Sequence, residues 1–190
     1  MTDDESPDSD SERYAVVLDV LHHGRTDGVR SRFDPPIAFA VDEEDFTLYE
    51  VSLADDADIS IDDRIRVQPD FEEGVKRGHT VDYDDLTDGA RSELDYVVEE
   101  IVEANERQFV DFYNDAQAVS LRQHQLDLVP GIGSTLRDKI LDERKRGPFE
   151  SFEDLDERVS GLHNPKEVVV ERILSEIKDG DVKYHLFVRS

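Results

Sequence analysis

The sequence contains no cysteine and no tryptophan, and only one methionine. Without cysteine the chain can form no disulfide, no thiolate metal site and no cysteine nucleophile. No stretch approaches the roughly 20 apolar residues that a membrane-spanning helix needs, so we expect no membrane partner. The first residues are acidic and lack the basic and apolar regions of a secretory signal, and we therefore expect a cytoplasmic protein.

Lysine is scarce as well: the basic residues are 16 arginines and only 6 lysines, against 48 acidic residues. The formal net charge of −26 repels itself in dilute buffer and destabilises a compact state there. In molar salt the Debye length falls to about 3 Å, which screens that repulsion. This composition is typical of a halophile's cytosolic protein. Because 37% of the residues are hydrophobic, with clear periodicity after residue 13, we expect a folded core rather than an acidic disordered chain.

The acidic surplus is unevenly distributed along the chain. Residues 1–119 carry 10 basic and 34 acidic side chains, whereas residues 120–190 carry 12 and 14. In so acidic a protein, a nearly neutral third is the surface that a polyanion approaches most easily. Chance plus one basic helix would give the same difference, so the asymmetry supports a binding site only together with a motif.

The first part of the chain is typical of a small β domain that follows an acidic tail. Residues 1–12 are polar and acidic, and we expect them to be disordered. Short strands at this spacing favour a small barrel or sandwich, and we expect an OB-like β-barrel over residues 13–83. Strands are predicted at 14–21, 37–41, 46–53 and 64–67, and residues 75–83 form either a fifth strand or a loop.

The hydrophobic period changes from that of a strand to that of a helix near residue 87. Thr87 is a good N-cap for the helix that follows it, and a second helix is predicted over Glu106–Asp115. Residues 84–118 thus form two connecting helices. Residues 181–190 alternate in polarity and predict a final strand that returns to pair with the barrel. The expected fold class is therefore α+β.

The most informative segment is LRQHQLDLVPGIGSTLRDKILDERKRGPFESFEDL, which begins at Leu121. It predicts a helix-hairpin-helix over residues 121–147. A first short helix, flanked by Leu121, Leu128 and Val129, leads to a tight turn at 130–133. Ser134 is expected to cap a second helix, which Gly147 and the proline after it end.

The predicted turn has the chemistry of an anion site. Its two glycines have no Cβ, so another backbone or a phosphate can approach closely. The first turn of the second helix leaves N–H groups unpaired, and these donors and the helix dipole favour a phosphodiester oxygen without any contact to a base. The expected nucleic-acid-binding residues of this segment are Gly131, Ile132, Gly133, Ser134, Thr135, Lys139, Arg144, Lys145 and Arg146.

The run LVPGIGSTLRDKIL, followed by GPFESFEDL, resembles the helix-hairpin-helix family, in which an apolar-x-Gly-apolar-Gly turn joins two short helices. The resemblance implies binding to DNA or RNA backbones without sequence readout, in some members with a monovalent cation held by hairpin carbonyls. One position departs from the pattern, because Arg137 stands where a small residue usually lets the two helices pack closely. Residues 119–180 are expected to form a bundle of two such copies. The second copy lacks one glycine and is expected to serve structure, the alternative being a second phosphate site near Gly161.

Over residues 13–190 the chain resembles an archaeal family, the domain of unknown function 655. The resemblance rests on the β-rich N-terminal part, the two connecting helices, the LVPGIG and FESFEDL runs and the final YHLFV segment. Members are described as RNA-binding proteins. The resemblance implies no catalytic residue and no cofactor, and it favours RNA over DNA as the partner.

Two further basic groups are candidates for contact with nucleic acid. Arg25, Arg30 and Arg32 lie in the loop after the first strand, which in an OB-like barrel often meets nucleic acid. Lys76 and Arg77 form the second group. Both groups can equally serve only to offset the surrounding acids.

The leading hypothesis is thus a non-enzymatic nucleic-acid-binding protein. The alternative is an acidic protein-interaction adaptor whose N-terminal part docks onto a basic partner, such as a ribosomal or translation-associated protein. A nuclease or hydrolase has no positive support, because no acid–base pair can be singled out among so many carboxylates.

Overall fold

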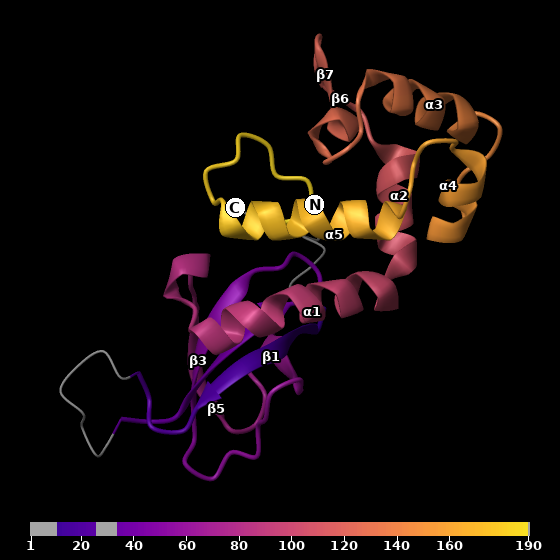
Figure 1. Ribbon diagram of the computed structural model, residues 1–190. Coiled ribbons are helices and arrows are strands. Elements are labelled where there is room, and N and C mark those ends of the chain that lie inside the picture. Colours follow the sequence, from indigo (N-terminus) through magenta and orange to yellow (C-terminus); the bar gives the residue numbers. More distant parts are fainter. Residues whose placement is uncertain (1–10, 26–33, 190) are drawn as a thin grey trace, which may run out of the picture. The chain divides into compact units, whose positions relative to one another are not determined.

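The computed structural model describes residues 11–25 and 34–189 (Figure 1). The fold is α+β, as predicted, and it divides into two compact units, residues 1–97 with 188–190 and residues 98–187. The helix α1 (Asp88–Ala104) contains the point of division. Most of the predicted acidic tail, residues 1–10, lies outside the described residues.

The first unit is built on a five-stranded antiparallel sheet with the strand order β4-β1-β2-β3-β5. The central strand β2 is buried at every position, and it contributes to the apolar core together with its neighbours. Register shifts in three of the four strand pairs curl the sheet, because a bulge bends the strand that carries it. The strands are β1 (Arg13–Leu21), β2 (Ile37–Asp42), β3 (Leu48–Leu53), β4 (Arg64–Gln68) and β5 (Val75–Thr80).

The predicted closure of this sheet into a barrel is not seen in the described part of the chain, because β4 and β5 share no ladder. After β4 the chain folds back on itself. The N–H of Glu72 donates to the carbonyl of Arg66 at 2.9 Å, and the Glu72 carboxylate accepts the Arg66 N–H at 3.2 Å. The outer edge of β4 is therefore bonded to its own connection instead of to β5.

The start of α1 is fixed to the sheet by Thr87, which follows the 3₁₀ helix η1 (Tyr83–Asp85). As predicted, Thr87 is the cap: its side chain accepts the N–H of Ala90 at 3.0 Å. The same hydroxyl donates to Asp19 on β1 at 2.5 Å. A Cβ on Gly89 would lie 2.9 Å from that carboxylate, so only glycine lets the helix come this close to β1.

The second unit combines four helices with one short ladder. The helix α2 has the predicted bounds, and the hydroxyl of Tyr113 on α2 donates to the Pro165 carbonyl at 2.9 Å, which fixes the start of α5. Burial raises the pKa of Tyr113. The elements are α2 (Glu106–Asp115), β6 (Ala118–Ser120), β7 (Gln123–His124), the 3₁₀ helix η2 (Gln125–Leu128), α3 (Ser134–Arg144), α4 (Phe152–Arg158) and α5 (Pro165–Lys178).

The predicted final strand is wrong, because residues 181–189 form turns and bends. Glu176 on α5 is 1% exposed, and its carboxylate accepts the N–H of Leu186 at 2.8 Å and that of the next residue at 3.0 Å. Arg172, also on α5, donates to the carbonyl of Tyr184 at 2.7 Å. Backbone groups that a strand would pair with the sheet are therefore bound to side chains of α5.

A buried ion pair joins the start of β1 to the end of β2. One nitrogen of the Arg13 guanidinium lies 2.7 Å from Asp42 and 2.6 Å from Asp45, and the side chain of Asp42 is fully buried. Burial raises the pKa of Asp42, and the hydrogen bond from Arg13 opposes this shift. Removing the guanidinium would leave an uncompensated carboxylate in the core.

We expect Arg13→Met to lower the free energy of unfolding by about 3–5 kcal/mol, because a buried charge then lacks its partner. Arg107→Met is the control, since it removes a largely exposed pair with Asp111 and should cost at most about 1 kcal/mol. Urea unfolding in molar KCl measures both values. Equal losses for the two variants would contradict this role of Arg13.

Candidate nucleic-acid interface

The turn between η2 and α3 is open on its outer side. Gly131 has a φ of +79°, a left-handed conformation that favours glycine. A Cβ built on Gly131 or Gly133 would meet nothing within 4 Å. Ile132 between them, one of the expected binding residues, is 5% exposed and belongs to the core. The two glycines therefore face open space, while the residue between them anchors the turn.

The helix α3 begins at Ser134 with Gly133 as its N-cap, so the cap lies one residue before the predicted one. Its first intrahelical bond runs from the N–H of Arg137 to the Gly133 carbonyl, at 2.9 Å. In the described part of the chain, no acceptor is bonded to the N–H groups of residues 134–136. Ser134 and Thr135 are exposed. Three backbone donors therefore point out of the helix end, beside the two glycines.

The first turn of α3 also differs in charge from every other helix of the described chain, because it contains no acidic residue. An acid in the first turn stabilises a helix through its dipole, and here that interaction is missing. The helix end keeps its positive potential. The first-turn acids of the other helices are Asp84 and Asp85 in η1, Asp88 in α1, Glu106 in α2, Asp127 in η2, Glu153 and Asp154 in α4, and Glu167 in α5.

Arg137, the residue that departs from the family pattern, holds η2 against α3. Its Nη1 lies 3.0 and 2.9 Å from the two carboxylate oxygens of Asp127. Asp127 also accepts the N–H of His124 at 2.9 Å. Burial alone would raise the pKa of Asp127, but these donors outweigh it and lower the pKa. The ion pair thus replaces the close packing that a small residue would allow.

The predicted first helix of the hairpin is reduced to the single turn of η2, and the β6–β7 ladder takes the place of its N-terminal part. Leu121 and Arg122 form the turn of this ladder. Of the residues expected to flank the helix, Val129 is buried, whereas Leu121 is fully exposed, with a relative accessibility of 107%. The β-hairpin is held by Gln117 and Gln125, which bond each other through two contacts of 2.8 Å.

The predicted basic residues of α3 are not gathered at its N-terminus. Lys139 is exposed and donates to the carbonyl of Ser160 at 2.9 Å. Arg144 donates to two backbone carbonyls at the end of α2, at 3.2 and 2.9 Å. Lys145 and Arg146 each pair with an acid three residues earlier. Because a helix rises about 1.5 Å per residue, these two lie roughly 16 Å along the axis from the free amides, and Lys139 about 8 Å.

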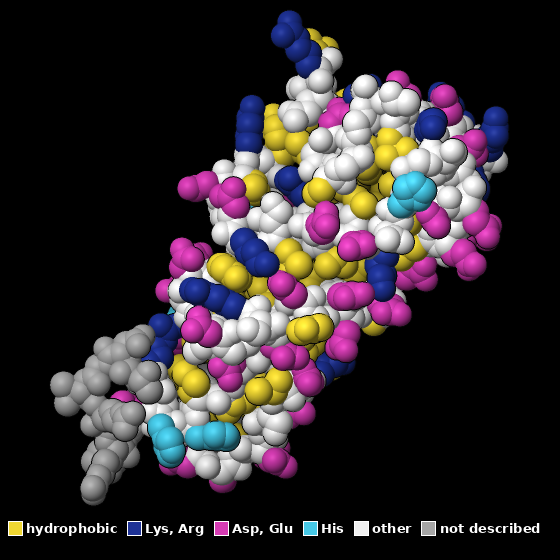
Figure 2. All heavy atoms as spheres, in the orientation of Figure 1, with side chains coloured by type: hydrophobic (Ala, Val, Ile, Leu, Met, Phe, Trp, Pro, Cys, Tyr) yellow, Lys and Arg dark blue, Asp and Glu magenta, His cyan; other side chains and the backbone are white. Residues whose placement is uncertain are grey.

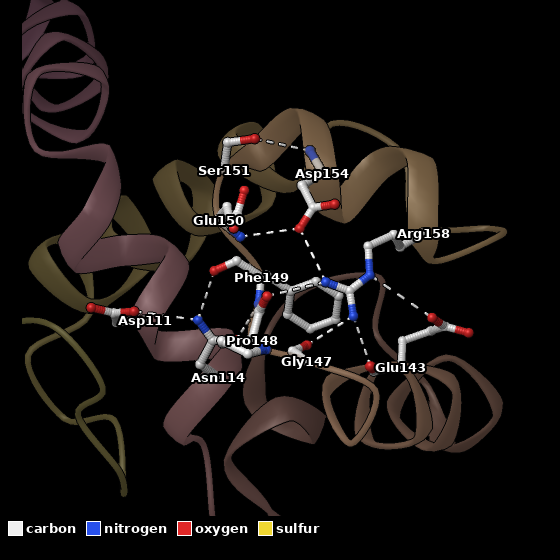
Figure 3. Close-up of polar contacts among 10 residues, drawn as sticks. All are labelled: Asp111, Asn114, Glu143, Gly147, Pro148, Phe149, Glu150, Ser151, Asp154 and Arg158. Atoms are coloured by element: carbon white, nitrogen blue, oxygen red, sulfur yellow. Dashed lines mark hydrogen bonds and ion pairs between the residues drawn. The ribbon is translucent and has the colours of Figure 1, made fainter.

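The far end of α3 is held by Arg158 on α4 (Figure 3). Its Nη2 donates to the carbonyls of Glu143 at 2.7 Å and Gly147 at 2.8 Å, and its Nη1 donates to Pro148 at 3.1 Å. The guanidinium carbon lies 4.5 Å from the centre of the Phe149 ring. This cation therefore binds one carbonyl in the last turn of α3 and two carbonyls of the segment that follows it.

The turn before α5, the predicted second hairpin, begins like the turn before α3 but ends differently, because its N-cap Asn164 is left-handed where Gly133 is extended. Gly161 has a φ of +98°, and the N–H of Leu162 donates to Val159 at 3.1 Å, as Ile132 does to Val129 at 3.2 Å. Its helix α5, however, begins with a proline, which has no N–H, and has an acid in its first turn. It is thus the poorer anion site of the two.

The basic residues predicted in the first unit have separate surroundings. Arg25 pairs with Glu50 at its carboxylate and donates to the Asp85 carbonyl at 3.2 Å. Arg30 and Arg32 lie outside the described residues. Lys76 and Arg77 are exposed on the edge strand β5, and no acid of the described chain is bonded to them.

Residues 11–25 and 34–189 contain no group of three or more histidines and carboxylates that is arranged to hold a metal ion. None of the helices there is long and apolar enough to cross a membrane.

The turn η2 gives a pH-dependent prediction. The Nδ1 of His124 accepts the N–H of Leu126 at 3.1 Å, which requires a neutral ring. Desolvation, and then the charge of Arg144, lower the pKa of His124 below its ordinary 6.5. The unfolded chain therefore takes up the proton first. The stability that neutral His124 contributes is present above pH 6.5 and is lost as the pH falls towards the folded pKa.

His124→Asn keeps an acceptor at this position but does not titrate. We expect the thermal midpoint of the wild type to fall more steeply than that of the variant between about pH 7 and pH 5.5, at constant KCl. Parallel profiles for the two proteins would contradict the role of the neutral ring.

Comparisons with known proteins agree with this architecture. A chain from Archaeoglobus fulgidus with a solved crystal structure is 40% identical, with a TM-score of 0.80, and the match covers 94% of this chain and all of that one. An uncharacterised protein of Methanocaldococcus jannaschii is 37% identical over 182 residues, which are 94% of this chain and 80% of the relative. The model of a family described as protein of unknown function, DUF655, matches residues 11–189. The chain therefore belongs to the DUF655 family.

Proposed function

We propose that this protein binds structured RNA, without catalysing a reaction on it, through the backbone amides at the start of α3. The observation that carries the proposal is that this helix end alone, among the described helices, has no acid in its first turn. Three free N–H groups lie there, next to two glycines that face open space. A phosphate oxygen fits such an end through its charge and through hydrogen bonds from the amides.

On this proposal, residues 121–147 are a helix-hairpin-helix whose first helix is shortened to η2, and residues 119–180 hold two copies of it. The glycine with positive φ and the hydrogen bond that follows it, which the two turns share, support this interpretation. Each hairpin is also braced by a cation from the other copy: Lys139 donates to Ser160, and Arg172 donates to Leu128 at 2.9 Å. The first unit would then be an open, OB-like sheet that carries Lys76 and Arg77 as a second contact.

The distribution of acids supports the same site. Between residues 116 and 137, Asp127 is the one acidic residue, although the whole chain has 48 acids in 190 residues. Asp127 is in turn neutralised by Arg137. A polyanion therefore meets little repulsion over the segment that contains the open turn.

The geometry also suits a protein that works in high salt. Affinity that comes from counterion release falls steeply as the salt concentration rises. Fixed amides make short, charge-assisted hydrogen bonds to phosphate, and these depend less on the ionic atmosphere. The preference for RNA over DNA rests on the resemblance to proteins described as RNA-binding. If the protein instead binds a basic protein and shows no affinity for any nucleic acid, the hypothesis of a protein-interaction adaptor is favoured.

Gly133→Val tests the open turn. Gly133 is extended, with a φ of −89°, so valine fits its backbone, and the new side chain covers the amides. We expect affinity for an RNA stem-loop in multimolar KCl to fall by about tenfold or more, as expected when charge-assisted hydrogen bonds are lost. Gly180→Val is the control, because that glycine also has open space around it. Unchanged affinity in Gly133→Val, with a normal thermal midpoint, would overturn the proposal.

Thr135→Glu gives a second test, in which stability and binding change in opposite directions. An acid in the first turn stabilises a helix by about 0.3–1 kcal/mol at low salt, so folding should be unchanged or slightly improved. RNA affinity should nevertheless fall, because the new carboxylate competes for the amides. Gln108→Glu adds the same charge to the first turn of α2 at an exposed position and should leave affinity unchanged. Equal affinity losses in both variants would indicate a general charge effect and no site at α3.

A further inference from the structure

The β6–β7 hairpin ends in an apolar side chain that nothing in its own unit covers. Leu121 is 107% exposed, the most of any large hydrophobic residue in the described chain; the next is Tyr96, at 68%. Turn positions favour small and polar residues, so a leucine here gains nothing for the turn itself. Figure 1 shows that the hairpin projects from the helices of its unit, and Figure 2 shows hydrophobic and basic side chains at its end.

The residue after Leu121 is a cation whose side chain has no bonded partner among residues 11–25 and 34–189. Arg122 is exposed, and its single hydrogen bond in the structure is from its backbone N–H to the Ser120 hydroxyl, at 3.3 Å. The six other arginines of this unit all bind an acid or a backbone carbonyl: Arg107, Arg137, Arg144, Arg146, Arg158 and Arg172. In a chain with 48 acids, an arginine left without one is available to an external anion.

The hairpin is fixed at its base to the open turn. The N–H of His124 on β7 donates to Asp127 on η2, and Asp127 binds Arg137 on α3. The 3₁₀ turn η2 packs against both β7 and α3. The tip of the hairpin and the amides of α3 are thus connected through η2, so one ligand can contact both.

We propose that this tip is a wedge, in which Leu121 packs on an unstacked base while Arg122 binds the neighbouring phosphate. The inference rests on the proposed function and names its substrate class: RNA with unpaired nucleotides next to a duplex. An apolar side chain gains little from a sugar-phosphate backbone, but it can pack on the face of a base that a loop or bulge exposes. An uninterrupted duplex offers no such face at its backbone. The amides at the start of α3 bind the RNA backbone, and the tip of the β6–β7 hairpin distinguishes RNA with an unpaired base from an uninterrupted duplex.

The test compares two RNA ligands of equal length, a stem with a central bulge and an uninterrupted stem with blunt ends, in multimolar KCl. We expect the wild type to prefer the bulged stem. Leu121→Asn should lower affinity for the bulged stem by about tenfold, as expected from the loss of one buried leucine, and should leave affinity for the uninterrupted stem unchanged. Arg122→Gln should weaken binding to both ligands, because it removes a phosphate contact.

Tyr96→Asn is the matched control, since it removes another exposed apolar side chain and should change neither affinity. A fluorescent base analogue placed in the bulge should change its emission on binding to the wild type but not to Leu121→Asn. If the wild type binds neither RNA, the proposed function fails. If the wild type binds and Leu121→Asn keeps both affinities, the wedge is wrong and the proposed function stands. If Leu121→Asn instead loses only the capture of a protein, the tip is a protein contact and the wedge is equally wrong.

Discussion

The excess of 26 negative charges limits where a second polyanion can approach this protein. Most described cations are bound to acids or to backbone carbonyls, and almost every helix start has its own carboxylate. The start of α3 is the exception, because its amides are free and its first turn is uncharged. Since a helix end without a counter-charge attracts anions, this exception is the physical basis of the proposed RNA site.

The turns before α3 and α5, the two proposed hairpins, share part of their backbone but differ at the helix start. Both use a glycine with positive φ and a buried apolar residue after it, and each is braced by a cation from the other. Pro165 and Glu167 make the start of α5 a poor site for phosphate, because one donor is absent and one acid is present. On the proposed function, the second hairpin therefore serves structure and the first binds the ligand.

Local patterns predicted the elements whose partners are close in sequence. The period of the strands, the cap at Thr87 and the bounds of α2 are of this kind, and so is the turn at Gly131. The prediction of a final strand was wrong because the buried carboxylate of Glu176 accepts its amides, and the alternation of polar and apolar residues does not reveal such a contact between side chain and backbone. The expectation for Leu121 was wrong because an apolar residue beside a helix-like pattern is normally buried. The absence of acids from residue 116 to residue 126 is the sequence signal that could have distinguished the tip of the β6–β7 hairpin from the packed segments around it.

Amide hydrogen exchange of the protein with and without an RNA stem-loop, in multimolar KCl, tests the account most directly. If the start of α3 binds phosphate, the amides of residues 133–136 should exchange more slowly when RNA is bound, while the exchange rates of the amides at the start of α5 should be unchanged. Protection confined to β5, or to the start of α5, would contradict the account even if the protein binds RNA tightly.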